Sequence, residues 1–191
     1  MSGEVGSAAL ASGAALAWSN AVLPRLAGRY DWGREGRAVA TVCFCIADSL
    51  VARSRVPAVV GVTAGAALAV GGLARTQPVV RDAPADLARW VLLDIPLGTV
   101  LPEELLFRGS LTPRLVEALG PHGGSVAGAL LFGLWHVGAA EASRDPVLPT
   151  IAVTVAAGAV FDAITRRTRR LWPSVAAHWT LNSVGAILSS G

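Results

Sequence analysis

Two adjacent carboxylates stand inside an apolar stretch of the chain, Leu101–Gly109 (LPEELLFRG). Glu104 and Arg108 are four residues apart, so on a helix they share one face and lie within ion-pair reach. Glu103 points about 100° away around the same helix. One acid therefore has a partner within its own helix, and the other is free to face a different group. Ionisable residues in membrane segments usually face a bundle interior or a hydrated cavity where they have a function.

Two further pairs of polar or aromatic residues follow on separate apolar stretches. Phe132 and His136 are four residues apart, and so are His178 and Asn182, so each pair lies on one helix face. If these helices pack against Glu103, a carboxylate and an imidazole can hold and deprotonate water. An imidazole N–H and an amide N–H can stabilise the oxyanion of a tetrahedral intermediate. These residue types are those that amide hydrolysis requires.

Each of these residues also has a structural interpretation. Glu104 and Arg108 can be an ion pair that locks two helices, and His136 and Asn182 can be interhelical hydrogen-bonding residues. We expect His122, in a Pro–Gly turn, at the surface. Three other acids are expected at an interface or in helix pairing rather than along a cavity: Asp48, Asp94 and Asp162. The occurrence of all three motifs in order, in a chain with three histidines, favours the chemical interpretation.

The composition indicates an integral membrane protein. Of the 191 residues, 53% are hydrophobic and only 15% are charged, and the mean hydropathy is +0.54, whereas about a quarter of a soluble domain is charged. The net charge of +3 suits contacts with anionic lipid headgroups. No basic run alternates with aromatic residues, so a nucleic-acid partner is not expected. Cys43 and Cys45 are interpreted as small apolar filling residues, not as a disulfide or a metal site.

The apolar runs predict an all-α, polytopic membrane helix bundle of about seven transmembrane helices, in a range of about six to eight. The predicted spans are roughly residues 5–27, 38–52, 58–74, 87–119, 125–140, 147–165 and 171–188. The second span is short, so it is tilted, half-inserted or extended into the charged loop 29–37. Gly61 and Gly65 predict close helix packing of the third span.

Prolines and arginines add two further expectations. Pro96 and Pro102 should interrupt the fourth span, so that residues 103–119 form a separate helical piece starting at Pro102. Residues 121–124 (PHGG) should form a turn. The arginines of residues 25–37 and of residues 166–170 predict opposite orientations for a seven-span topology, which leaves the orientation open.

The three motifs together resemble those of the CPBP family of intramembrane proteases, which includes CAAX prenyl endopeptidases of the Rce type and bacterial Abi or bacteriocin-immunity proteins. The motifs are Glu103-Glu104-x-x-x-Arg108, Phe132-x-x-x-His136 and His178-x-x-x-Asn182, and no motif position departs from the pattern. The resemblance covers roughly residues 87–190. Residues 1–86 are interpreted as N-terminal transmembrane helices of the same bundle, and residues 87–191 as the protease core.

The resemblance implies a role for each motif residue. It implies that Glu103 is the general base that activates water and that His136 shares this water. It implies an oxyanion hole made by His178 and Asn182. Three further residues are implied to organise the site or pack beside it: Glu104, Arg108 and Phe132.

The resemblance also implies a glutamate-based mechanism without a metal or other cofactor. Zinc stays an alternative, since two histidines and a glutamate can bind it and leave a water position open. The expected substrate is a membrane-associated peptide or protein, and the expected location is a bacterial plasma membrane. Two other functions stay open: a non-catalytic immunity or scaffold protein, and a small transporter.

Overall fold

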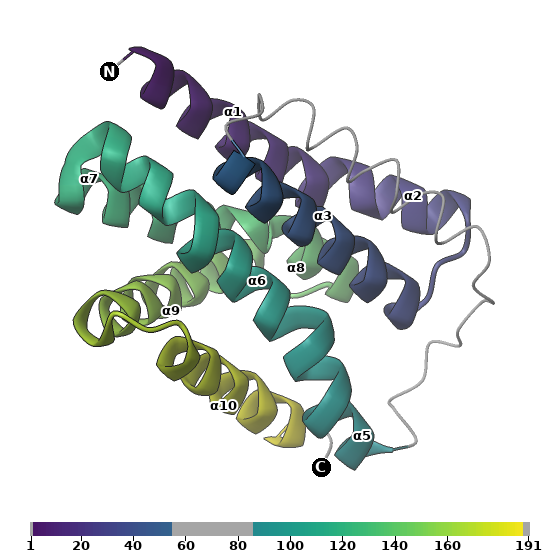
Figure 1. The fold of residues 1–191 in the computed structure, drawn as a ribbon. Coiled ribbons are helices and arrows are strands. Elements are labelled where there is room, and N and C mark those ends of the chain that lie inside the picture. The colour runs from purple at the N-terminus through teal and green to yellow at the C-terminus, as the bar shows by residue number, and fades with distance from the viewer. Residues whose placement is uncertain (1, 55–85, 189–191) are drawn as a thin grey trace.

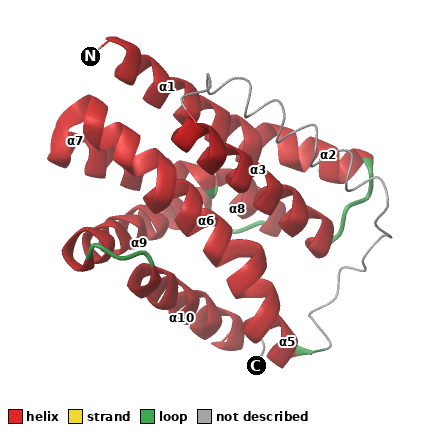
Figure 2. Ribbon diagram, in the orientation of Figure 1, coloured by secondary structure: helices red, strands yellow, loops and turns green. Residues whose placement is uncertain are grey.

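The computed structural model describes residues 2–54 and 86–188. Every element in these two ranges is a helix, and no strand occurs in them (Figure 2). The protein is therefore a helical bundle, as the sequence predicts. The third predicted span, residues 58–74, and its Gly61–Gly65 pair lie outside the described residues.

The N-terminal part of the bundle is a bent helix followed by a second helix that packs against it (Figure 1). Its elements are α1 (Ser2–Ala17), the π-helical turn η1 (Trp18–Val22), α2 (Leu23–Arg29) and α3 (Arg34–Ser54). Trp18 stacks on Phe44 of α3, with ring centroids 4.9 Å apart and an interplanar angle of 3°. The sequence predicts that the short second span is tilted, half-inserted or extended into the charged loop 29–37. The structure shows that the helix extends into this loop, because α3 begins at Arg34.

A long helical stretch then runs from Leu87 to a sharp bend at Gly120. Its elements are α5 (Leu87–Arg89), η2 (Trp90–Asp94), η3 (Pro96–Val100), α6 (Leu101–Leu106), η4 (Phe107–Leu111) and the first part of α7 (Thr112–Trp135). The prediction that Pro102 starts a separate helix is wrong, because the helix continues through it. Figure 1 shows this stretch passing through the middle of the bundle.

The four prolines Pro24, Pro96, Pro102 and Pro113 each stand two residues after the end of a π-helical turn. Proline lacks an N–H and its ring collides with the carbonyl four residues earlier in an α-helix. A π turn shifts the bonding to carbonyls five residues earlier, as in the bond from the Ile95 N–H to Trp90 O. This shift moves the carbonyls out of their α-helical positions before the ring, which lets the helix continue.

The turn predicted at residues 121–124 lies one residue earlier. Gly120 has φ 77° and ψ 169°, a conformation that favours glycine, and Pro121 already begins the second half of α7. The two halves of α7 pack closely beside this bend. A Cβ atom on Gly124 would collide with the backbone of Val116.

The C-terminal part of the bundle consists of α8 (Val137–Ser143), α9 (Val147–Thr168) and α10 (Trp172–Leu188). The helices α7 and α9 pack tightly through two glycines. Gly133 lies against Ile151 and Val155 of α9, and Gly158 of α9 lies against the ring of Phe132. These contacts fix the spacing between α7, which ends at His136, and α10, which carries His178, since α9 also packs on α10.

Two helical stretches of the described ranges are long and apolar enough to cross a membrane: Leu87–Ser143, which includes the bend at Gly120, and Val147–Thr168. The number of about seven spans stays a prediction. The burial pattern is that of a bundle with an apolar exterior and a partly polar interior. Large apolar side chains are exposed on several helices, for example Leu10, Leu92, Leu97, Leu148, Val153 and Leu188, whereas Glu103, Glu104 and Arg108 are buried.

The other acids and cysteines have structural roles. Asp48 accepts hydrogen bonds from Ser110 Oγ and from Arg114 Nη1, the latter at 3.1 Å, so the predicted helix pairing of α3 is confirmed. Asp94 and Asp162 pair instead with arginines of their own helical segments, Arg89 at 3.8 Å and Arg166 at 3.0 Å. Asp162 also lines two pockets beside α9, so the expectation that it does not lie along a cavity is wrong. No disulfide joins Cys43 and Cys45, and His122 is exposed as predicted.

Candidate active site

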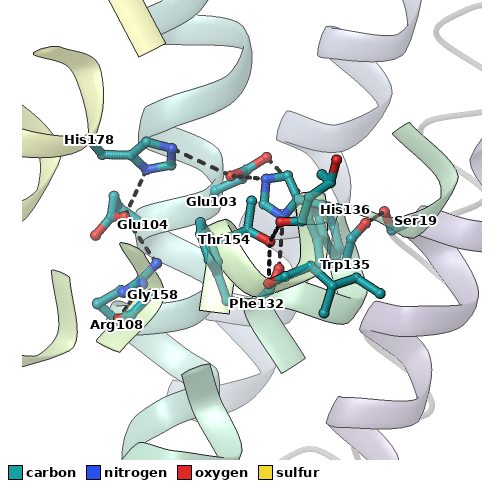
Figure 3. Close-up of polar contacts among 12 residues, drawn as sticks. Ser19, Glu103, Glu104, Arg108, Phe132, Trp135, His136, Thr154, Gly158 and His178 are labelled. Atoms are coloured by element: carbon teal, nitrogen blue, oxygen red, sulfur yellow. Dashed lines mark hydrogen bonds and ion pairs between the residues drawn. The ribbon is translucent and has the colours of Figure 1, made fainter. Parts of the chain in front are cut away.

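Glu104 is fully buried and holds together three helices. Arg108 Nη1 donates to its Oε1 at 3.0 Å, which confirms the ion pair predicted from the spacing. His178 Nδ1 of α10 lies 2.9 Å from the same oxygen. Arg108 Nη2 donates to the backbone carbonyl of Gly158 in α9 at 2.9 Å (Figure 3). This network fixes the ring of His178 relative to α6 and α9.

Glu103 points away from this network and lies between two imidazole rings (Figure 3). Trp135 Nε1 donates to its Oε1 at 3.2 Å. Its Oε2 lies 3.8 Å from His136 Nε2 and 3.8 Å from His178 Nε2. This oxygen is buried and has no hydrogen-bond partner among the described residues. Adjacent residues of one helix thus have different surroundings, as the 100° offset predicts.

The hydrogen bonds of the two rings fix where their protons lie. His136 Nδ1 is 2.7 Å from the carbonyl of Phe132, and a carbonyl only accepts, so Nδ1 carries a proton. His178 Nδ1 faces the carboxylate of Glu104 and donates in the same way. In neutral rings both Nε2 lone pairs therefore face Glu103 Oε2. Three acceptors converge there, and a water molecule or an added proton is needed to supply a donor.

Aromatic rings enclose this group of acceptors. Phe132 meets both imidazoles edge-on, with centroid distances of 4.8 Å to His136 and 5.7 Å to His178. The guanidinium of Arg108 lies 4.4 Å from the Phe132 centroid. Phe161 stacks on His178 at 4.7 Å. The rings limit contact with solvent, since the side chains of His178 and Glu103 are 3% and 7% exposed and that of His136 is 20% exposed.

Asn182 is the one predicted site residue that the structure does not connect to the others. It lies one helical turn after His178 on α10 and is half-buried. Within the described ranges no hydrogen bond joins its side chain to Glu103, His136 or His178. Its place on the same helix face as His178 is the only geometric link to the site.

The chain matches a family model. The model of the type II CAAX prenyl endopeptidase Rce1-like family matches residues 85–184, about half of the chain. The protein belongs to this Rce1-like family. No curated protein and no solved structure matches the chain. The matched region contains all the motif residues from Glu103 to Asn182, so the resemblance to the CPBP and CAAX proteases is confirmed.

The Rce1-like site contains three residues that the motif spacing did not single out: Trp135, Gly158 and Phe161. Trp135 has a sequence signal, because it directly precedes His136 and a buried indole N–H needs an acceptor. No sequence signal identifies Gly158 or Phe161, because their contacts with Arg108 and His178 depend on how α9 packs. In the described parts of this family member, no group of three or more His, Cys, Asp or Glu side chains is placed to hold a metal ion.

Proposed function

We propose that this Rce1-like protein is an intramembrane glutamic endopeptidase that hydrolyses a peptide bond in a membrane-associated peptide or protein. One observation carries the proposal. Glu103 Oε2 is buried, lacks a hydrogen-bond partner within the described residues and faces two imidazole Nε2 atoms at 3.8 Å. A water molecule between these atoms would donate to the carboxylate and to one ring, which is the arrangement that general base catalysis needs.

In the proposed reaction, Glu103 takes a proton from this water while His136 Nε2 accepts the second hydrogen bond. The hydroxide attacks the carbonyl carbon of the scissile peptide bond and forms a tetrahedral intermediate. Glu103 then gives its proton to the leaving nitrogen as the C–N bond breaks. One water is consumed, and the products are a carboxylic acid and an amine.

The oxyanion of the intermediate needs donors, and α10 offers two. In the proposed reaction, His178 takes a proton from solvent at Nε2 before the attack and donates from this atom, while its Nδ1–H stays on Glu104. The amide of Asn182, one turn further on, is the second proposed donor. Glu104 and Arg108 organise the site by orienting His178, and Phe132 packs between the rings. Removing one oxyanion donor typically lowers kcat on the order of 10²–10³-fold.

We propose that the mechanism needs no metal. A zinc ion bound by Glu103, His136 and His178 would make Glu103 a ligand, and a separate carboxylate would then have to accept the proton. Glu104 is the neighbouring acid, but its side chain points away from Glu103 and His136 into the network with Arg108 and His178, where its Oε1 accepts from both (Figure 3). We therefore expect full activity after chelation and less than stoichiometric zinc in the purified enzyme. Stoichiometric zinc whose removal abolishes turnover would contradict this.

For the whole chain, we propose a multi-pass protein of about seven membrane helices in a bacterial plasma membrane. The exposed leucines and valines and the two long apolar stretches support this topology. The scarcity of charged residues, 15% of the chain, supports it as well. The N-terminal helices and the matched region would form one bundle, because α3 contacts α6 and α1 contacts α7.

The function is tested by Glu103→Gln, with Glu117→Gln on the exposed face of α7 as the matched control. The probe is a farnesylated fluorogenic peptide that ends in a CAAX sequence, in detergent micelles. Comparative proteomics of membranes from cells with either variant extends the search to other substrates. We expect Glu103→Gln to lower cleavage on the order of 10²–10⁴-fold and to accumulate a precursor. Normal cleavage by Glu103→Gln would refute the proposed role of Glu103.

A further inference from the structure

His136 lies at a break in the helix, between α7 and α8. It has φ −87° and ψ −1°, and its N–H donates at 3.1 Å to the carbonyl of Gly133, only three residues earlier. In an uninterrupted α-helix, each N–H donates to the carbonyl four residues earlier. The break leaves backbone groups on both sides of His136 that need other partners.

Two residues of η1 supply these partners. Asn20 Oδ1 accepts a hydrogen bond from Gly138 N at 2.7 Å, and Asn20 Nδ2 donates to Leu134 O at 2.9 Å. One carboxamide therefore takes the place of the helical bond between residues 138 and 134. Ser19 Oγ donates to the next carbonyl, that of Trp135 (Figure 3). We call Ser19 and Asn20 the η1 clamp.

The surroundings of the η1 clamp hold it in place. Trp18, the residue before it, is buried and stacks on Phe44 of α3. Gly138 allows the close approach from the other side, because a Cβ there would lie 3.0 Å from Ser19 O and 3.1 Å from Asn20 Oδ1. Distances of 3.0–3.4 Å are tighter than nine in ten Cβ contacts in proteins, so the η1 clamp would have to shift by a few tenths of an ångström to admit a Cβ atom. The sequence thus provides both a rigid donor–acceptor pair and a space for it.

We propose that Ser19 and Asn20 are positioning residues, which keep the helix broken at His136 so that its Nε2 faces Glu103. This inference rests on the proposed hydrolysis. Both residues lie outside the family match of residues 85–184, so it assigns a role in the active site to the N-terminal helices. Without the carboxamide, Gly138 N and Leu134 O are free to bond directly. The helix would then continue through residue 136 and rotate the imidazole away from the carboxylate.

Asn20→Ala tests the clamp, with Ser12→Ala as the matched control, because among the described residues Ser12 Oγ bonds to Ala8 O of its own helix. With the farnesylated peptide, we expect Asn20→Ala to lower kcat roughly 10- to 100-fold, as for a misplaced catalytic group, with KM changed less than twofold. Asn20→Asp keeps the acceptor for Gly138 N and should lose less activity. A purely structural role would change the amount of folded enzyme, not kcat per folded molecule.

Gly138→Ala perturbs the same contact from the opposite side and should give the same kcat defect. A second readout does not depend on cleavage: NMR of ¹⁵N-histidine and ¹⁵N-glycine labelled protein in micelles. We expect the ring signals of His136 and the amide signal of Gly138 to move in Asn20→Ala and to stay in place in Ser12→Ala. If the wild type cleaves neither the farnesylated peptide nor a membrane precursor found by proteomics, the proposed hydrolysis fails, while these signals still test the clamp. Wild-type kcat in folded Asn20→Ala, or unmoved His136 signals, would overturn the inference.

Discussion

Replacing Trp135 with phenylalanine isolates the one hydrogen bond that orients the carboxylate of Glu103. The indole Nε1 donates to Oε1 at 3.2 Å, and this leaves Oε2 facing the histidines. In the wild type the rings of Trp135 and Phe107 pack edge-on, with centroids 5.7 Å apart. Phenylalanine at position 135 keeps an aromatic ring against Phe107 but removes the N–H donor. A hydrogen bond to a charged group contributes about 1.5–3 kcal/mol.

If this contribution is needed in the transition state, kcat falls by roughly 10- to 150-fold, because about 1.4 kcal/mol corresponds to a factor of ten. We expect KM to change little, since Trp135 is buried and its indole N–H faces the carboxylate of Glu103. The assay is steady-state cleavage of the farnesylated peptide, with thermal unfolding measured in the same micelles.

Trp179→Phe is the matched control. Its indole N–H also donates a hydrogen bond, at 2.8 Å, but the acceptor is the neutral backbone carbonyl of Val91 in η2 and not the carboxylate of Glu103. We expect this variant to lose some thermal stability and to keep its kcat. Equal kcat values for Trp135→Phe and Trp179→Phe would refute the reasoning that Glu103 needs an oriented carboxylate.

Three further substitutions test the packing around the site. Arg108→Met leaves the buried carboxylate of Glu104 without its ion pair, and we expect a loss of about 3–5 kcal/mol in the free energy of unfolding, measured by denaturation in mixed micelles. Gly158→Ala places a Cβ 3.0 Å from the ring of Phe132, and we expect overpacking to cost about 1–3 kcal/mol and to lower kcat. Asp48→Ala removes the acceptor of two interhelical hydrogen bonds, so the melting temperature should fall while kcat per folded molecule stays the same.

The sequence predicts the parts of the site that depend on spacing along one helix. The Glu104–Arg108 pair and the separate direction of Glu103 follow from helical geometry, and the structure contains both. The donation from Trp135 to Glu103 depends on how two distant helices pack, so periodicity alone does not determine it. The same holds for the η1 clamp, in which residues more than 100 positions away along the chain meet the backbone around His136.

The predicted helix boundary at Pro102 is wrong because of how the helix accommodates proline. A proline inside a helical pattern usually predicts an interruption, and that rule gave the wrong boundary at Pro102. The prediction did not include a preceding π turn, whose presence depends on the hydrogen bonding of several residues together. The bend that does occur, at Gly120, needs a positive φ and lies one residue before the PHGG segment.

The π turn of residues 96–100 also makes the direction of the two acids depend on the number of residues before them. Each residue added to or removed from this turn would rotate everything after it by about 100°. Glu103 would then no longer face His136 and His178. Glu104 would leave its place among the three helices that it holds together, although all the motif side chains would still be present. A single-residue deletion in this segment should therefore be more harmful than most replacements there, and the length of the segment carries as much information as its composition.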